Sequence, residues 1–136
     1  MTDFWLSGGR LLTPRGILDG AVQVRGGCIA AIREKAPGGS RTIRVRGAYL
    51  APGFIDLHVW GSPSAVSAAA ARHGTTAFLS ALGPEPRERL LEHLERHGSL
   101  QALSGAQCLG VHLEGPFLNP ARGGALPRRW MRRPSV

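Results

Sequence analysis

The chain has 136 residues, of which 43% are hydrophobic and 19% are charged. This composition is typical of a folded globular protein and excludes an intrinsically disordered one. The length suits one compact domain and is too short for two complete ones. Lys and Arg number 17 and Asp and Glu number 9, so the formal net charge is +8, a basic balance that raises the question of a nucleic-acid partner.

The order of the basic residues argues against such a partner. Lys35 is the only lysine, and the arginines are spread along the chain except for four near its end. These four are Arg128, Arg129, Arg132 and Arg133. A nucleic-acid surface would gather basic and aromatic side chains on one element, and only Trp130 lies among these arginines. We therefore expect no nucleic-acid partner.

No segment predicts a membrane or secretory protein. The most apolar run, residues 65–71, is far shorter than the roughly 20 residues that cross a bilayer. Asp3 stands where a secretory signal would carry basic residues. Cys28 and Cys108 are too far apart in the sequence for a CxxC motif, and we interpret both as small buried side chains. The expectation is a cytoplasmic protein with no membrane partner.

Residues 1–51 predict a small all-β unit in which turn glycines separate short strands. The candidate strands cover residues 21–25, 28–32 and 42–45. Val22 and Val24 alternate with polar neighbours, as do Ile43 and Val45, so each strand should bury one face. Another layer must then cover that apolar face.

From residue 52 onward, strands alternate with helices. The predicted order is a strand at 53–60, a helix from Pro63 to Gly74 capped by Ser62, a strand at 75–82, a helix opened by Pro84 and Pro86 that ends near Gly98, and a strand at 106–113. This βαβαβ order implies parallel strands with crossover helices. The tail, residues 115–136, predicts a long loop.

Glu114 is the best single candidate for chemistry in the chain. It lies at the carboxyl end of the third of these strands, where reactive groups gather in parallel α/β architectures. Gly115 and Pro116 fix the chain direction after it, which suits a metal ligand. The alternative is an acid that only makes a loop hydrogen bond. His112 points to the same side of the strand, either packed or orienting Glu114.

A second group of candidates shares one side of the strand at 53–60. Asp56, His58 and Trp60 lie there by alternation. Two histidines at this spacing would clip a metal ion, but the second position is Trp60. His58 is therefore a candidate single ligand, Asp56 a candidate for orienting it, and Trp60 an aromatic wall or core residue.

Two further patterns are weaker. His93 and His97 have the i, i+4 spacing of a metal clip on the second helix, but charged neighbours favour a solvated helix face. Gly123 and Gly124 could present backbone N–H groups to an anion, with Arg122 beside them.

The motifs together resemble a known family. Residues 52–58 (PGFIDLH) are similar to the opening of the barrel in the metal-dependent amidohydrolase superfamily. Residues 73–76 (HGTT), 110–120 (GVHLEGPFLNP) and Gly124-Ala125 resemble the N-acetylglucosamine-6-phosphate deacetylase family. The implied α/β fold is the N-terminal part of a small β-sandwich, residues 1–51, and the first three strands of an incomplete (β/α)8 TIM-type barrel, residues 52–136.

The resemblance also implies chemistry. The family removes acetate from N-acetylglucosamine 6-phosphate with a divalent metal ion, here one ion of zinc or iron. Glu114 matches the carboxylate ligand. Ala125 and Leu126 stand at a substrate-contacting position: the family commonly has Gly-Ala-His or Gly-Thr-His where this chain has Gly124-Ala125-Leu126, and its histidine meets the sugar. Two further ligands and the catalytic aspartate would lie beyond Val136. We therefore expect an N-terminal fragment, inactive alone, with no catalytic residue of its own.

Alternatives remain open. Trp60 and Leu126 depart from the family pattern, which keeps another amidohydrolase, a cyclic amidase or a deaminase, in consideration. A non-catalytic basic interaction fragment that uses the arginine-rich tail is an alternative of another class. A homodimer of the complete enzyme is also open.

Overall fold

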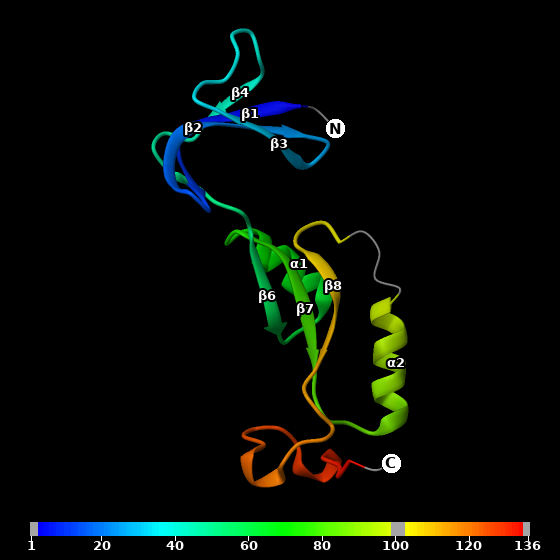
Figure 1. Ribbon diagram of the computed structural model, residues 1–136. Coiled ribbons are helices and arrows are strands. Elements are labelled where there is room, and N and C mark those ends of the chain that lie inside the picture. The colour runs from blue at the N-terminus through cyan, green and yellow to red at the C-terminus, as the bar shows by residue number, and fades with distance from the viewer. Residues whose placement is uncertain (1–2, 99–102, 135–136) are drawn as a thin grey trace. The chain divides into compact units, whose positions relative to one another are not determined.

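The computed structural model describes residues 3–98 and 103–134. The chain has an α/β fold that divides into two compact units, Met1–Pro52 and Gly53–Val136 (Figure 1). The first unit contains strands only, and the second unit alternates strands with helices, as the sequence predicts. Within the described residues, no helix is long and apolar enough to cross a membrane.

The first unit is a five-stranded sheet. Its strands are β1 (Phe4–Thr13), β2 (Gly16–Arg25), β3 (Cys28–Arg33), β4 (Thr42–Arg44) and β5 (Tyr49–Leu50). The order is β3-β2-β1-β4, and β5 also pairs with β1. The hairpin between β2 and β3 turns at Gly26 and Gly27, which both have positive φ, at 58° and 82°. A two-residue turn of this kind requires positive φ at both positions, and glycine provides it without strain.

The core of the first unit is small. Its buried apolar side chains are Trp5, Leu11, Ala21 and Val22. The burial predicted for Val22 is therefore confirmed, but Ile43 is 47% exposed and its predicted burial is wrong. Cys28 is exposed as well, so the prediction of a buried cysteine is wrong there. Ile43 lies on the face of Val22, which no second layer covers within the described residues. Cys28 pairs with Arg25 beside the hairpin turn, on the other face.

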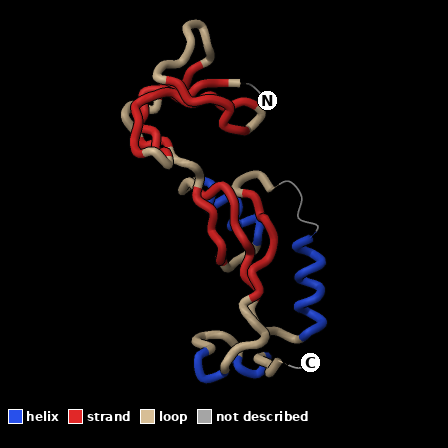
Figure 2. Tube along the Cα trace, in the orientation of Figure 1, coloured by secondary structure: helices blue, strands red, loops and turns tan. Residues whose placement is uncertain are grey.

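The second unit carries the βαβαβ order that the sequence predicts (Figure 2). Its elements are β6 (Phe54–Val59), α1 (Pro63–Ala71), β7 (Thr75–Leu82), α2 (Arg87–Gly98) and β8 (Gln107–Leu113). The three strands form a parallel sheet in the order β6-β7-β8. Because parallel strands end at the same edge, the residues that follow β6 and β8 lie at one end of the sheet.

Helix α1 begins where the sequence predicts and ends at Ala71, before Gly74. The side chain of Ser62 makes no capping hydrogen bond, so that part of the prediction is wrong. Ser62 is its N-cap residue and Pro63 its first residue, and the turn after Ala71 closes at Gly74, with φ at 87°. Ser67 is buried and attaches the helix to the start of β8. Its carbonyl oxygen accepts from the backbone N of Ala106 at 3.0 Å, and its Oγ accepts from the backbone N of Gly105 at 3.1 Å.

The histidines of helix α2 face the protein and do not form a solvated face as expected. His97 Nδ1 donates to the His93 carbonyl at 2.6 Å, and its Nε2 accepts from the hydroxyl of buried Ser80 at 3.1 Å. His93 Nδ1 lies 2.7 Å from Glu85 Oε1. The contact with Ser80 attaches α2 to β7, and the contact with Glu85 attaches it to the loop that precedes it. Both histidines therefore already have partners.

The tail is a loop that contains two short 3-10 helices, Pro120–Arg122 and Arg128–Trp130. Glu114 begins it, and its backbone N donates to the Leu82 carbonyl at 2.8 Å. The Gly115-Pro116 peptide bond is cis. Further along, the backbone N of Arg132 donates to the Pro116 carbonyl at 2.8 Å, so the tail folds back on its own beginning.

Candidate metal and substrate site

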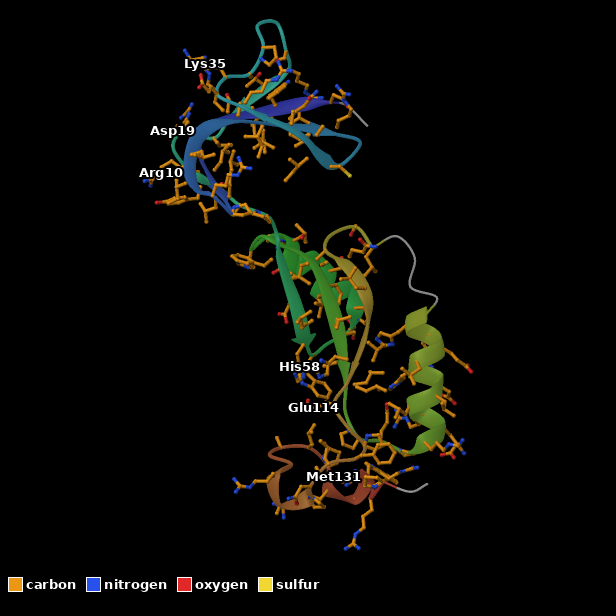
Figure 3. The ribbon with its side chains drawn as sticks, in the orientation of Figure 1. Arg10, Asp19, Lys35, His58, Glu114 and Met131 are labelled. Atoms are coloured by element: carbon orange, nitrogen blue, oxygen red, sulfur yellow. The ribbon has the colours of Figure 1, made fainter. Side chains whose placement is uncertain are left out.

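His58 and Glu114 meet at the carboxyl end of the three-stranded sheet (Figure 3). His58 Nε2 lies 3.1 Å from Glu114 Oε2, although β7 separates their two strands. The outer strands are about 10 Å apart, twice the usual spacing, and only long side chains bridge that distance. The two best ligand candidates from the sequence are thus brought together.

His112 contacts the imidazole of His58. The two rings stack with their centroids 4.5 Å apart and their planes 11° apart. His112 Nδ1 lies 2.9 Å from the Leu57 carbonyl, so it donates this hydrogen bond and is itself held against β6. The sequence placed His112 beside Glu114, and the contacts found are with His58 and the backbone of β6.

Asp56 acts on the backbone of the same segment. Its Oδ1 accepts from the backbone N of His58 at 3.0 Å, and the residue is exposed. The carboxylate therefore fixes the main chain at His58. Alternation predicted that Asp56 and His58 share a side, but the structure shows no hydrogen bond between the Asp56 carboxylate and the imidazole among the described residues.

Glu114 also lines an open cavity of about 470 Å³. The other residues that line it are Trp60, Arg122, Gly123, Gly124, Ala125 and Leu126. The two predicted substrate-contacting residues, Ala125 and Leu126, are thus brought together with Glu114. The cavity carries one carboxylate and one guanidinium, with backbone and apolar side chains between them.

Gly83 is a site residue that the sequence analysis missed. A Cβ at this position would lie 2.8 Å from Trp60 Cη2 and 3.3 Å from Leu126 Cδ2. Trp60 and Leu126 therefore pack over the bare backbone of Gly83, directly after β7. The only signal in the sequence is a glycine at a strand end, which carries no chemical group to single it out.

The donors at this site suit a divalent metal ion as part of a ligand set. A carboxylate oxygen and an imidazole nitrogen are common ligands of zinc and iron, which need about four or more. Within residues 3–98 and 103–134, no three His, Cys, Asp or Glu side chains form a group that could hold a metal. Glu114 and His58 thus fit as two ligands of an ion whose remaining ligands come from elsewhere.

Comparison with known proteins shows what the sequence and the fold are similar to. Residues 1–43 match the family model described as the composite domain of allantoinase. Residues of both units align with a crystal structure of a D-hydantoinase at 23% identity and a TM-score of 0.66, over 82% of this chain and 27% of that one. At that identity the likeness concerns the fold alone.

The chain is related to N-acetylglucosamine-6-phosphate deacetylases. It is 31% identical to the enzyme of that name from Bacillus subtilis over 134 residues, which cover 86% of this chain and 33% of the relative. It is 31% identical to the Rattus norvegicus enzyme over 96% of this chain and 32% of the relative. The crystal structure of the Pasteurella multocida deacetylase aligns with a TM-score of 0.80 at 26% identity, over 98% of this chain and 40% of that one.

The matches to deacetylases confirm the resemblance that the motifs around Glu114 indicate. An adenine deaminase from Deinococcus radiodurans is 39% identical over 94 residues, which cover 63% of this chain and 17% of that protein. The chain spans about a third of the length of the curated deacetylases that it matches.

Proposed function

We propose that the protein hydrolyses the N-acetyl group of N-acetylglucosamine 6-phosphate, releasing acetate and glucosamine 6-phosphate. The observation that carries this proposal is that Glu114, which His58 contacts, lines the same cavity as Ala125 and Leu126. Relatives that align over most of the chain carry the deacetylase name. The activity belongs to a protein that supplies the further ligands and the catalytic aspartate from outside residues 1–136.

In this proposal Glu114 is a metal ligand and His58 either a second ligand or the donor that orients Glu114. One divalent ion, zinc or iron, fits better than a pair, because the indole of Trp60 has no lone pair for a metal where a second imidazole would be needed. When bound, such an ion supplies polarisation of the amide carbonyl and activation of water. His112 holds the imidazole of His58, and Asp56 holds its backbone.

The finer architecture is part of the same proposal. We assign residues 1–51 to a β-sandwich segment and residues 52–136 to the first three strands of a (β/α)8 barrel. The parallel order β6-β7-β8 and the position of Glu114 at a carboxyl strand end support this assignment. The substrate in this proposal is a small molecule, an amino-sugar phosphate, and the enzyme is a cytoplasmic metabolic one. The complete protein is a candidate homodimer, and light scattering measures its oligomeric state.

A cyclic amidase or a deaminase is the second candidate. The match of residues 1–43 to the composite domain of allantoinase favours it, as do Trp60 and Leu126, which make one side of the cavity apolar. A purine or cyclic-amide ring would pack against such side chains as well as a sugar ring does.

Two experiments separate these candidates. Sequencing the template past the codon for Val136 is expected to show a continuing frame that encodes two strand-end histidines and a late aspartate. The protein from the complete frame, loaded with zinc or iron, is then assayed for acetate from N-acetylglucosamine 6-phosphate, ring opening of allantoin or hydantoin, and ammonia from adenine. Acetate release alone supports the proposal, and either of the other two products with no acetate would overturn it.

A further inference from the structure

We propose that Trp60 and Leu126, packed together over Gly83, form an apolar wall that binds the C–H face of the substrate's sugar ring. This inference rests on the proposed function and goes beyond it, because it assigns the recognition of the ring to side chains that make no contact with the metal. The three residues come from three separate segments, the ends of β6 and β7 and the tail.

The first observation is the packing over Gly83. Trp60 Cη2 and Leu126 Cδ2 lie 2.8 Å and 3.3 Å from the position that a Cβ would take there. Real Cβ atoms do not approach other atoms to 2.8 Å, so any larger residue at this position would displace the indole. Gly83 therefore sets where the indole lies, and Leu126 packs beside it on the same backbone.

The second observation is the location of this pair. Trp60 and Leu126 line the same cavity as Glu114, with Ala125 and the two glycines of the tail completing it. Trp60 is 52% exposed and lines this cavity. Large indoles that stay exposed inside a cavity are characteristic of binding sites, because aromatic faces bind the apolar faces of rings.

The chemistry of Trp60 and Leu126 determines what the wall can bind. Neither Leu126 nor the face of an indole offers a hydrogen bond to a hydroxyl, so this side of the cavity binds through apolar contact. The C–H groups on one face of a pyranose ring provide such a surface. Arg122 and the backbone of Gly123 and Gly124 provide the polar side of the same cavity, so the ring is held between unlike surfaces.

The test uses the protein from the complete reading frame, with affinity measured by calorimetry and with KM and kcat measured separately. Gly83→Ala displaces the indole without touching a ligand of the metal. Its matched control is Gly38→Ala, because a Cβ at Gly38 meets no atom within 4 Å. We expect Gly83→Ala and Trp60→Ala to weaken binding of glucosamine 6-phosphate about 10-fold and to raise KM similarly, as loss of ring stacking does. Metal content should stay at the parent value.

A second pair of variants separates an apolar contact from simple filling of space. Leu126→Met keeps an apolar side chain of similar volume and should bind within about 3-fold of the parent. Leu126→Asn is polar and should bind about 10-fold more weakly. The proposal would be overturned if Leu126→Asn bound glucosamine 6-phosphate as tightly as the parent, or if Gly83→Ala bound it as tightly as Gly38→Ala.

Failure of the wall and failure of the proposed function give different results. Acetate release by the parent protein decides the function alone. Calorimetry decides the wall without turnover, since glucosamine 6-phosphate, the product, is titrated into parent and variants. N-acetylglucosamine 6-phosphate is titrated as well where the parent releases no acetate. If the parent releases no acetate but the parent and variants bind these sugar phosphates with the predicted order of affinities, the wall is supported and the proposed function is not. If the parent binds neither sugar phosphate, the wall is excluded.

Discussion

His58 contacts Glu114 across the whole width of the three-stranded sheet, with 3.1 Å between Nε2 and Oε2. The strand between them, β7, contributes no side chain to this contact. The pair therefore depends on the parallel order of β6, β7 and β8, and it exists only when all three strands are paired. The candidate metal site is thus a direct product of the fold of the second unit.

Glu114→Gln is predicted to remove metal from the protein. An amide is a much weaker metal ligand than a carboxylate, so the affinity should fall at least about 100-fold, whereas His58→Gln should cost about 10- to 100-fold. The measurement is metal content by mass spectrometry after gel filtration in buffer low in metal. Glu92→Gln, on the exposed surface of α2, is the control. Full metal content in Glu114→Gln would exclude Glu114 as a ligand.

Ser80→Ala is predicted to destabilise the protein through His97. The substitution removes the hydroxyl that donates to His97 Nε2 and leaves that half-buried nitrogen without its partner. The free energy of unfolding should fall by about 1–3 kcal/mol. Urea denaturation of the protein from the complete frame checks this, with exposed Ser104→Ala as the control. Equal stability of the two variants would mean that the contact does not hold α2 to β7.

Phe78→Ala is predicted to be among the most destabilising substitutions in the second unit. Phe78 is fully buried at the centre of β7, and its truncation leaves a cavity that costs about 3–5 kcal/mol. Leu91→Ala on α2 should cost far less, because Leu91 is 48% exposed. The comparison is again made by urea denaturation, and similar losses for both would contradict the assignment of Phe78 to the core.

The 136 residues expressed on their own are predicted to aggregate or stay unfolded. Large apolar side chains are exposed on both sheets, among them Ile29 at 65%, Phe54 at 68% and Leu57 at 62%. Exposed apolar surface and open strand edges promote association. Gel filtration and circular dichroism test this directly. A monomer that melts cooperatively would contradict the prediction.

Much of the second unit follows from local sequence signals. The strand predicted at residues 75–82 is β7, and the predicted end of the second helix at Gly98 is the end of α2. Prolines and glycines mark these boundaries, and their effects depend on neighbouring residues alone. The burial of a side chain does not depend on neighbouring residues alone. Ile43 alternates like a core residue yet stays exposed, because burial requires a second layer that the described residues do not supply.

The site could be predicted only in part for the same reason. Alternation placed Asp56 and His58 on one side of β6, but the strand order and register decide that His58 and not Asp56 reaches Glu114. His97 resembled a surface residue by its charged neighbours, and its bond to Ser80 depends on how α2 packs on the sheet. Gly83 is informative only once Trp60 and Leu126 are known to pack over it.

The most direct test of the central claim is acetate release from N-acetylglucosamine 6-phosphate by the zinc- or iron-loaded protein from the complete reading frame. Parent protein and Glu114→Gln are compared, with Glu92→Gln as the control. The account predicts acetate release by the parent and the control, and a loss of about 100-fold or more in Glu114→Gln. Acetate release that is unchanged in Glu114→Gln, or its absence in the parent together with ring opening of allantoin or ammonia from adenine, would contradict it.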